Sequence, residues 1–352
     1  MGWKLYDRSW GVLLERSDCQ GALKVVDIGV SYGNRRVIKG VSFSVKGGET
    51  YVLVGRNGSG KSTLLRAVAG LLEAEGKVLY SCEDYSSLPA WRRRFALFTS
   101  PFPLVRARSV RENMLISARL AGLSEKDAQG EVRRVALDFG IEHLLNRRPR
   151  ELSMGERQKV GLATVVLSRP RALLVDEPFN HLTREWTLEV AKELRRAVRE
   201  LGLPAVVATP RLDDAIVLGM ELRAGVIYEG ELIVESTVEE LVHKPPHVAV
   251  IETLDVYSRN LLPLNDGLAR SLGVRCEEDS TRAWIPPWMF DRDGTGGVEV
   301  ELESYASGPL GITAVLRVAE RKLEALMRDI GGKRLRVTVR GAICYDREGR
   351  RK

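Results

Sequence analysis

The sequence contains no long uninterrupted apolar run, and no stretch approaches the ~20 residues that a membrane-spanning helix needs. It has no low-complexity tract, and its first ten residues, MGWKLYDRSW, lack the positive and then apolar pattern of a signal peptide. Of the 352 residues, 44% are hydrophobic and 29% are charged, which is typical of a globular protein. These features predict a cytoplasmic chain that reaches a membrane only through a partner.

Cysteine is scarce, since the chain has four widely separated ones, Cys19, Cys82, Cys276 and Cys344. No CxxC pair and no Cys/His spacing of a zinc site is present. A disulfide framework is not typical of a cytosolic chain of this size. We therefore expect four unpaired, buried thiols.

The charge is unbalanced toward basic residues, with a formal net charge of +7. Such a surface is compatible with nucleic acid, an anionic membrane face or a phosphate-bearing ligand. The arginine clusters at 92–94 and at Arg147, Arg148 and Arg150 have no interleaved aromatic residues. We interpret them as solvated helix faces and partner contacts, and we predict no nucleic-acid binding.

The order of patterns along the chain predicts an extension followed by two domains. Residues 1–21 are the expected N-terminal extension, residues 22–240 the first domain and residues 241–352 the second, with KPPH at 244–247 as a linker. In the first domain apolar strands alternate with helical segments, which predicts an α/β fold with a parallel sheet. Residues 89–160 are Arg-rich and helical in pattern, and are interpreted as a helical subdomain.

The second domain is predicted to be all-β, a small barrel or sandwich. Val298, Val300 and Leu302 alternate with glutamates, and residues 335–339 alternate in the same way, as half-buried antiparallel strands do. A short helix is expected between such strands, at about Arg321–Ile330.

A phosphate-binding motif follows the apolar strand TYVLV. The segment GRNGSGKS at 55–62 satisfies G-x-x-x-x-G-K-[ST] and is followed by a helical pattern. Backbone N–H groups and the helix N-terminus would face phosphates, Lys61 would reach the β- and γ-phosphates, and the Ser62 hydroxyl would bind Mg²⁺. The predicted nucleotide-binding residues here are Gly55, Asn57, Gly58, Ser59, Gly60, Lys61, Ser62 and Thr63.

Two carboxylates close a second apolar strand, RALLVDEP. Asp176 fits the carboxylate on the magnesium side, and Glu177 is placed to polarise the attacking water; with Lys61 it forms the predicted catalytic pair. A helix N-cap is the alternative explanation of such a pair. The preceding strand and the upstream glycine loop favour the catalytic interpretation.

The segment LSMGE at 152–156 resembles the LSGGQ signature of ABC ATPases, and the resemblance covers about residues 22–236. It implies an ABC-type P-loop NTPase that binds ATP and Mg²⁺ in a head-to-tail dimer. In such a dimer Ser153, Met154, Gly155 and Glu156 would act in trans on ATP held by the partner. Tyr32, in VSYG, matches the aromatic residue that stacks on adenine.

The second domain resembles the OB-like (TOBE-type) regulatory domain of the maltose-importer type of ATPase, through its strands and its closing YDREGRR. This resemblance implies a peripheral subunit on the cytoplasmic face of the cell membrane. Its partners would be transmembrane permease subunits, a second ABC ATPase subunit and, indirectly, an extracellular solute-binding protein. Sugar is the expected cargo, with polyamines, glycerol derivatives, metal oxyanions and phosphonates as alternatives.

Three positions depart from the family pattern. Ser100 stands at the Q-loop glutamine, Pro210 at the switch histidine and Thr183 at the D-loop aspartate. Two nearby side chains are possible substitutes for the histidine, His181 on the D-loop and Arg211. Slow hydrolysis without a substitute is the third alternative.

The departures from the family pattern affect one function more than the other. Ser100 and Pro210 stand at positions that serve the ATP on this chain's own loop, whereas the signature segment, which serves the partner's ATP, is nearly complete. A heterodimer with a different ATPase chain would explain this pattern, and a homodimer with altered chemistry is the alternative. Glu177 argues against a dead site. Transport-coupled hydrolysis is the leading hypothesis, against a regulatory subunit that binds ATP but hydrolyses it poorly, or a soluble ABC protein of translation or DNA repair.

Overall fold

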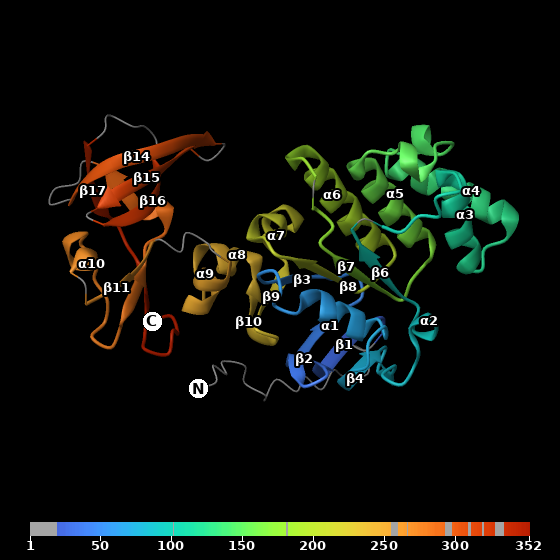
Figure 1. Ribbon diagram of the computed structural model, residues 1–352, viewed down its shortest axis with the longest axis horizontal. Helices are drawn as coiled ribbons and strands as arrows, with labels where there is room; N and C mark the ends of the chain where they lie inside the picture. The colour runs from blue at the N-terminus through green and yellow to red at the C-terminus, as the bar shows by residue number, and fades with distance from the viewer. Residues whose placement is uncertain are drawn as a thin grey trace. The chain divides into compact units, whose positions relative to one another are not determined.

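The computed structural model describes residues 20–100, 102–180, 182–254, 260–265, 267–292, 298–308, 311–318, 320–327 and 334–352. The chain divides into two compact units, with the boundary between Val238 and Glu239 (Figure 1). Nearly all of the expected extension at 1–21, and His181, lie outside the described residues. In the described part no helix is both long and apolar enough to cross a membrane.

A six-stranded sheet forms the centre of the first unit, in the order β10-β9-β3-β8-β7-β6. The strands from β6 to β9 run parallel, and β10 is antiparallel to β9. Three are five-residue strands with every residue buried, as expected for a sheet covered on both faces. Their bounds are β3 Thr50–Val54, β6 Phe95–Thr99, β7 Ala172–Asp176, β8 Ala205–Thr209, β9 Arg223–Tyr228 and β10 Glu231–Thr237.

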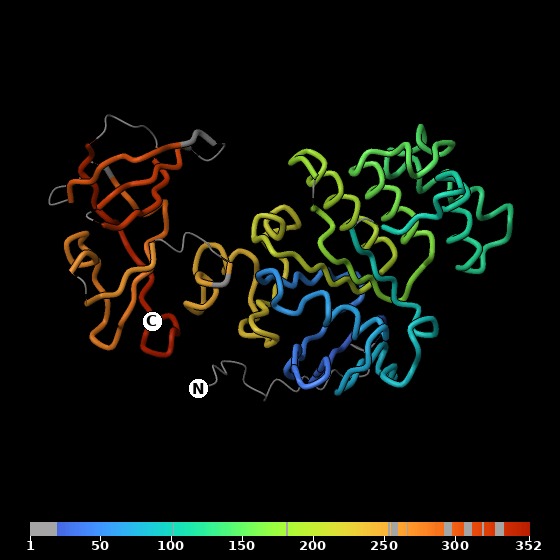
Figure 2. Tube along the Cα trace, viewed as in Figure 1, coloured from blue at the N-terminus to red at the C-terminus, as the bar shows by residue number. Residues whose placement is uncertain are grey.

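A second, antiparallel sheet has the order β2-β1-β4-β5. Its strands are β1 Leu23–Tyr32, β2 Arg35–Val45, β4 Glu75–Tyr80 and β5 Glu83–Asp84. Buried residues of β1, β2, α1 (Lys61–Val68) and the central sheet form one hydrophobic core, so α1 packs between the sheets. Figure 2 shows the blue N-terminal strands beside the yellow chain of β9 and β10, and β3 pairs with β9.

The remaining helices of this unit are α2 Ala90–Arg93, α3 Val110–Leu120, α4 Glu125–Asp138, α5 Met154–Leu167, α6 Arg184–Glu200 and α7 Leu212–Leu218. One part of the expected helical range 89–160 is not helical, since Phe95–Thr99 is the strand β6 at the edge of the central sheet. A five-residue apolar run is too short for its period to separate strand from helix. Pairing with β7 decides its conformation.

The second unit is rich in antiparallel strands. A five-stranded sheet has the order β13-β17-β14-β15-β16, with bounds Phe290–Arg292, Arg334–Val339, Val298–Gly308, Gly311–Val318 and Arg321–Met327. A three-stranded sheet contains β11 Leu261–Pro263, β12 Arg282–Trp284 and β18 Ile343–Tyr345. Three short helices accompany them, α8 Val238–His243, α9 Val248–Leu254 and α10 Leu268–Ser271. The two alternating segments predicted as strands are confirmed as β14 and β17.

The helix predicted at Arg321–Ile330 is wrong. Residues Arg321–Met327 form β16, which pairs along its length with β15. Leu323, Ala325 and Met327 are buried in alternation, the two-residue period of a strand. The segment is rich in good helix formers, but pairing and burial on the sheet outweigh this weak intrinsic preference.

The expectation of four unpaired thiols is also wrong. Cys276 and Cys344 form a disulfide with a Cα–Cα distance of 5.8 Å, Cys82 is disulfide-bonded, and no described cysteine is free. Cys276 precedes β12 and Cys344 lies in β18, and these strands are neighbours in the three-stranded sheet. Tertiary pairing therefore brings together two cysteines 68 residues apart, which sequence spacing does not reveal.

Candidate functional site

The glycine-rich loop joins the buried strand β3 to the start of α1. A Cβ atom at Gly55 would lie 2.3 Å from the carbonyl oxygen of Ile227, so only glycine fits beside β9. Gly60 has φ 106°, a left-handed conformation, and a Cβ there would lie 2.6 Å from Ile38 Cδ1. The two glycines let the loop lie in close contact with β9 and β2 and continue directly into α1.

The N-terminus of α1 is open to an anion. Its first turn contains no acidic residue, and no side chain caps it. The first backbone N–H groups of a helix have no intrahelical partner, and the helix dipole favours negative charge there. This arrangement suits a phosphate group.

Lys61, the first residue of α1, is a buried cation. Its Nζ donates hydrogen bonds to the carbonyl oxygens of Gly55 at 2.6 Å and Arg56 at 3.0 Å. Burial lowers the pKa of the Lys61 ammonium, while the negative charges of Glu177 and Asp176 raise it. The ammonium is thus held under the loop, in the field of both carboxylates.

Asp176 lies at the end of β7, one strand removed from β3 across β8. Burial raises the pKa of its carboxyl group, and a hydrogen bond with Ser62 opposes that rise. Asp176 Oδ1 is buried and has no hydrogen-bond partner among the described residues. A buried oxygen without a partner is costly unless another group satisfies it.

These oxygens fit a magnesium ion. Mg²⁺ keeps several waters and binds through one or two protein oxygens together with phosphate oxygens. Ser62 and Asp176 provide one hydroxyl and one carboxylate side by side, including the unpartnered Oδ1. Within the described residues no cluster of three or more His, Cys, Asp and Glu side chains is present, so an all-protein metal cage is not the arrangement here.

Glu177 follows Asp176 in a constrained conformation. Its φ is 50°, which is uncommon for a residue with a side chain, and its backbone N–H donates to Ala208 O at 2.9 Å. Asn180 Nδ2 donates a hydrogen bond to Glu177 Oε2. Unfavourable backbone conformations of this kind cluster at functional sites, where the surrounding structure holds them.

The structure shows what surrounds each of the three positions that depart from the family pattern. Ser100 Oγ accepts a hydrogen bond from Gln158 Nε2 at 2.9 Å. Thr183 is the N-cap of α6, with its Oγ1 accepting from Trp186 N at 3.5 Å. A threonine at this place therefore begins a helix, an effect that its N-capping preference could have predicted.

Pro210 follows β8 and provides no side-chain donor. The preceding residue, Thr209, donates from Oγ1 to Asp214 Oδ2 at 2.6 Å, and burial raises the pKa of the Asp214 carboxyl group. Arg211 is exposed and forms an ion pair with Asp213 at 3.7 Å, and its charge also lowers the pKa of Asp214, so it is engaged by these two carboxylates. These contacts do not favour Arg211 as a substitute for the missing histidine.

The signature segment begins α5. Ser153 is the N-cap and forms a reciprocal capping box with Glu156: Ser153 N donates to Glu156 Oε2 at 2.7 Å and Glu156 N donates to Ser153 Oγ at 3.3 Å. The backbone N–H of Ser153 chiefly lowers the pKa of Glu156, so this carboxylate is ionised. Met154 is exposed, Gly155 lies near Leu182, and the start of α5 presents an accessible surface.

Tyr32 lies at the other end of the first unit's sequence, at the end of β1. The residue is 48% exposed, and Gly33 and Asn34 turn the chain into β2. An exposed aromatic face of this kind is available for stacking on a planar ring.

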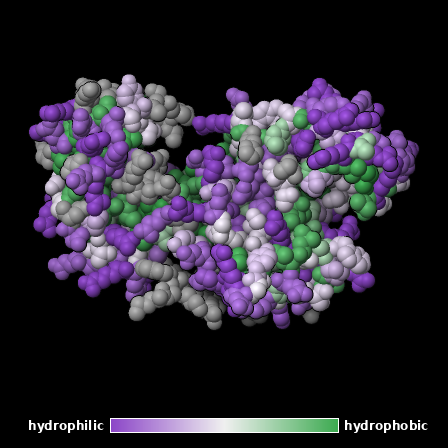
Figure 3. Space-filling model, in the orientation of Figure 1, coloured by the Kyte–Doolittle hydropathy of each residue, from purple (hydrophilic) through white to green (hydrophobic). Residues whose placement is uncertain are grey.

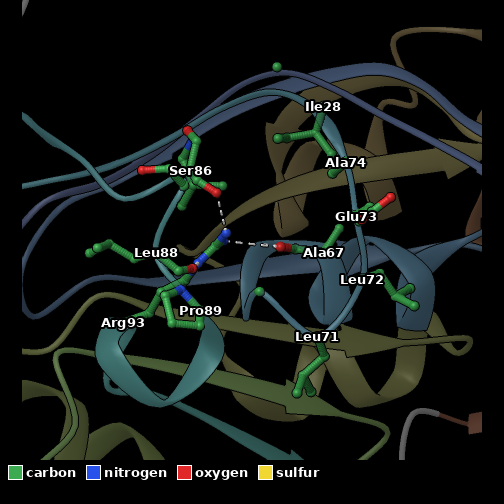
Figure 4. Close-up of a pocket in the computed structure, with 14 residues that line it drawn as sticks. Ile28, Ala67, Leu71, Leu72, Glu73, Ala74, Ser86, Leu88, Pro89 and Arg93 are labelled. Atoms are coloured by element: carbon green, nitrogen blue, oxygen red, sulfur yellow. Dashed lines mark hydrogen bonds between the residues drawn. The ribbon is translucent and has the colours of Figure 1, made fainter.

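A cavity of about 540 Å³ lies at the C-terminal end of α1, opposite the phosphate loop (Figure 4). Arg93 projects into its wall, and its guanidinium donates to the carbonyl oxygens of Ala67, Val68, Ser86 and Leu88 at 2.7–3.2 Å. Figure 3 shows apolar surface on the viewed face of this part of the molecule. Leu71 and Trp91 are 56% and 73% exposed.

Sequence reasoning missed Gln158 and Asn180, and its interpretation of Arg93 as part of a solvated helix face is wrong, because Arg93 is only 5% exposed. Gln158 is fully buried, but it stands between Arg157 and Lys159 in the sequence, so no local pattern marked it as buried. The contacts of Asn180 and Arg93 join segments far apart in the chain, which local patterns do not show.

Comparison with known proteins shows the family to which this chain is similar. The family model described as "ABC transporter" matches residues 38–180. The chain is 34% identical over 224 residues to the molybdate/tungstate import ATP-binding protein of Pyrococcus horikoshii, which covers 63% of this chain and 64% of that protein. The match thus spans slightly less than two thirds of that relative's length.

A longer match exists with the sn-glycerol-3-phosphate import ATP-binding protein of Cereibacter sphaeroides. It is 34% identical over 290 residues, covering 80% of this chain and 79% of that protein. A solved structure titled "Structure of ATP binding subunit of ABC transporter" superposes with a TM-score of 0.56 at 25% identity, over 62% of this chain and 91% of that one. The chain therefore belongs to the family of ABC transporter ATP-binding proteins.

Proposed function

We propose that this chain is the ATP-binding subunit of an ABC importer, which binds MgATP and couples its hydrolysis to solute uptake. The observation that carries the proposal is the convergence of the glycine loop, Lys61 and two carboxylates at the carboxyl edge of β3 and β7. Phosphoryl transfer requires positioning and charge stabilisation more than covalent participation by the protein. This site offers both.

Each residue has a defined task in the proposed reaction. The loop N–H groups and Lys61 hold the β- and γ-phosphates, with Lys61 exchanging the loop carbonyls it now contacts for phosphate oxygens. Ser62 and Asp176 hold the magnesium ion, which when bound neutralises the charge on the phosphate oxygens. Tyr32 stacks on the adenine ring.

Glu177 is the proposed general base. Its carboxylate polarises the attacking water, and its position directly after Asp176 sets it beside the γ-phosphate. Mutational removal of such a group costs about 10²- to 10⁴-fold in rate. The rigid backbone and the hydrogen bond from Asn180 support a fixed carboxylate.

We further propose a head-to-tail dimer in which Ser153, Met154, Gly155 and Glu156 close the partner's ATP site. The accessible start of α5 supports this, because a helix dipole favours negative charge at its N-terminus; the N–H groups of Ser153 and Glu156 are already bonded in the capping box. This chain's own site has Ser100 and Pro210 in place of the glutamine and the histidine of the family pattern. A second, different ATPase chain would supply the stronger site.

The cavity beside α1 is the proposed docking place of a permease segment. α1 has its phosphate loop at one end and the cavity at the other, about 12 Å apart for an eight-residue helix. A movement at either end is thus transmitted through one short rigid element. Exposed Leu71 and Trp91 supply apolar contact area.

The proposed location is the cytoplasmic face of the membrane, with an extracellular solute-binding protein acting indirectly and with no nucleic-acid partner. Sugar remains the proposed cargo. Relatives named for glycerol-3-phosphate and molybdate/tungstate import widen the set to other organic solutes and oxyanions. The second unit is proposed to act as an OB-like regulatory domain.

A regulatory subunit that hydrolyses poorly is the second candidate, favoured by Ser100 and Pro210. Turnover by the purified chain, alone and in the complex with which it co-purifies, separates the two when measured beside Glu177→Gln. Turnover by the isolated chain that Glu177→Gln abolishes supports the enzyme and overturns the regulatory candidate. MgATP binding with equal turnover in both forms refutes the proposed base.

A further inference from the structure

Gln158 joins three segments of the site from inside α5. The side chain is fully buried. Its Nε2 lies 2.9 Å from Ser100 Oγ, 2.8 Å from Pro178 O and 3.3 Å from Asn180 O. One amide thus connects the signature helix to the segment after β6 and to the segment after β7.

Asn180 continues this connection to the carboxylate. Its backbone oxygen accepts from Gln158, while its side-chain Nδ2 donates to Glu177 Oε2. Its backbone N–H also contacts Glu177 O at 3.5 Å. A continuous path therefore runs from the interior of α5, through one residue, to the group that faces the attacking water.

The amide of Asn180 suits the task of holding a carboxylate in place. A glutamate side chain has considerable rotamer freedom, and fixing it costs free energy that contacts must offset. An amide N–H donor binds one oxygen of the carboxylate directionally and leaves Oε1 for water. The amide stays neutral at every working pH, so its contact does not depend on protonation.

We propose that Asn180 is a positioning residue for Glu177, and that Gln158 positions Asn180 and so ties the geometry of the base to the signature helix. In this proposal both side chains act through Glu177 and not by contact with the nucleotide. The inference rests on the proposed role of Glu177 in ATP hydrolysis. It makes the base responsive to movement of α5, the helix proposed to close the partner's ATP site.

The alternative is that Gln158 and Asn180 are only structural ties. Loss of a purely structural contact would lower stability or nucleotide affinity. Loss of a positioning residue would instead lower the rate of the chemical step. Single-turnover hydrolysis with enzyme in excess measures this step, and MgATP titration measures affinity separately.

The first variants are Asn180→Asp, an isostere that replaces the amide donor, and Asn180→Ala. Both should lower the single-turnover rate about 10- to 100-fold, as small misplacements of catalytic groups do, with MgATP affinity changed less than threefold. Gln158→Met keeps the volume of the side chain and removes its three contacts, and should lower the rate in the same way. Gln129→Leu, an exposed glutamine on α4, is the matched control and should match wild type.

A double variant tests whether Gln158 and Asn180 both act through Glu177. Asn180→Ala with Gln158→Met should lower the rate no further than the stronger single change, because both act through Glu177. Neither should slow the residual reaction of Glu177→Gln. The path is wrong if both Asn180 variants turn over at the wild-type rate, or if Asn180→Ala slows Glu177→Gln as much as it slows wild type.

The two proposals fail in different ways. If Glu177→Gln hydrolyses ATP as wild type does, the proposed base is refuted and this inference is refuted with it. If Glu177→Gln is inactive but both Asn180 variants turn over at the wild-type rate, only the inference is refuted. Should Gln158→Met unfold, the half-exposed Asn180 variants still decide, since their effect on rate at unchanged MgATP affinity is the primary test.

Discussion

Replacing Arg93 by methionine should destabilise the first unit and loosen the helix that carries Lys61. The guanidinium is buried and donates to four backbone carbonyls, at 2.7, 2.8, 2.9 and 3.2 Å. Two of them, Ala67 O and Val68 O, belong to the last turn of α1, where a cation is favoured, and Ala67 O also accepts from Gly70 N at 2.9 Å. Burial lowers the pKa of Arg93 and nearby Asp84 raises it, so the neighbouring carboxylate and the helix end stabilise the charge.

The magnitude follows from these contacts. An unsatisfied buried acceptor costs about 1–3 kcal/mol, so the three carbonyls other than Ala67 O set an upper limit of about 9 kcal/mol. The adjacent cavity of about 540 Å³ admits water to part of the wall, which reduces the loss. We expect a decrease of about 3 kcal/mol in the free energy of unfolding for Arg93→Met.

Calorimetry of the whole chain measures the effect. For a unit of this size a loss of 3 kcal/mol lowers Tm by about 6–12 °C. Arg93→Lys should recover less than half, because an ammonium cannot reproduce the fork geometry of a guanidinium. A Tm within 2 °C of wild type for Arg93→Met, or full recovery by Arg93→Lys, would refute this reasoning.

Three further predictions concern other parts of the chain. Cys344→Ser opens the 68-residue loop that the disulfide with Cys276 closes. In denaturant titrations it should lower the free energy of unfolding of the second unit by about 4 kcal/mol. A thiol reductant should produce the same decrease in the wild-type protein. Ser100→Gln combined with Pro210→His restores two donors at the nucleotide and should raise steady-state turnover about 10-fold or more; unchanged turnover would mean that other groups limit this site. The pKa of Glu112 is lowered from its ordinary 4.5 to about 2, chiefly by the hydrogen bond from the backbone N–H of Ser109. The α3 capping box that Glu112 forms therefore stabilises the chain fully above about pH 4.5 and loses this contribution as the pH falls toward 2. Glu112→Gln should therefore be less stable than wild type at pH 7, and the difference should shrink by pH 2.5 in thermal unfolding; a constant difference would contradict it.

The sequence predicts those parts of the site whose residues are adjacent in the chain. The glycine loop, Lys61 and Asp176 follow from short motifs bounded by apolar strands, because each motif contains its own backbone requirement. Ser153 at the start of a helix follows from capping preferences in the same way. Local information is sufficient for such features.

Features that depend on distant partners could not be predicted in this way. β16 contains residues that favour a helix, and only pairing with β15 makes it a strand. The disulfide of Cys276 depends on the neighbouring β12 and β18, and the contacts of Gln158 depend on three segments meeting around one buried amide. In each case the deciding energy comes from tertiary packing.

Titration of the chain with MgATP, beside Lys61→Ala and with EDTA as the magnesium-free control, tests the central claim most directly. Lys61 is buried under the phosphate loop, and charged hydrogen bonds contribute about 1.5–3 kcal/mol each. We expect saturable one-site binding that Lys61→Ala weakens about 30-fold and that EDTA also weakens. Equal affinity in wild type and Lys61→Ala, or no saturable binding by wild type, would contradict it.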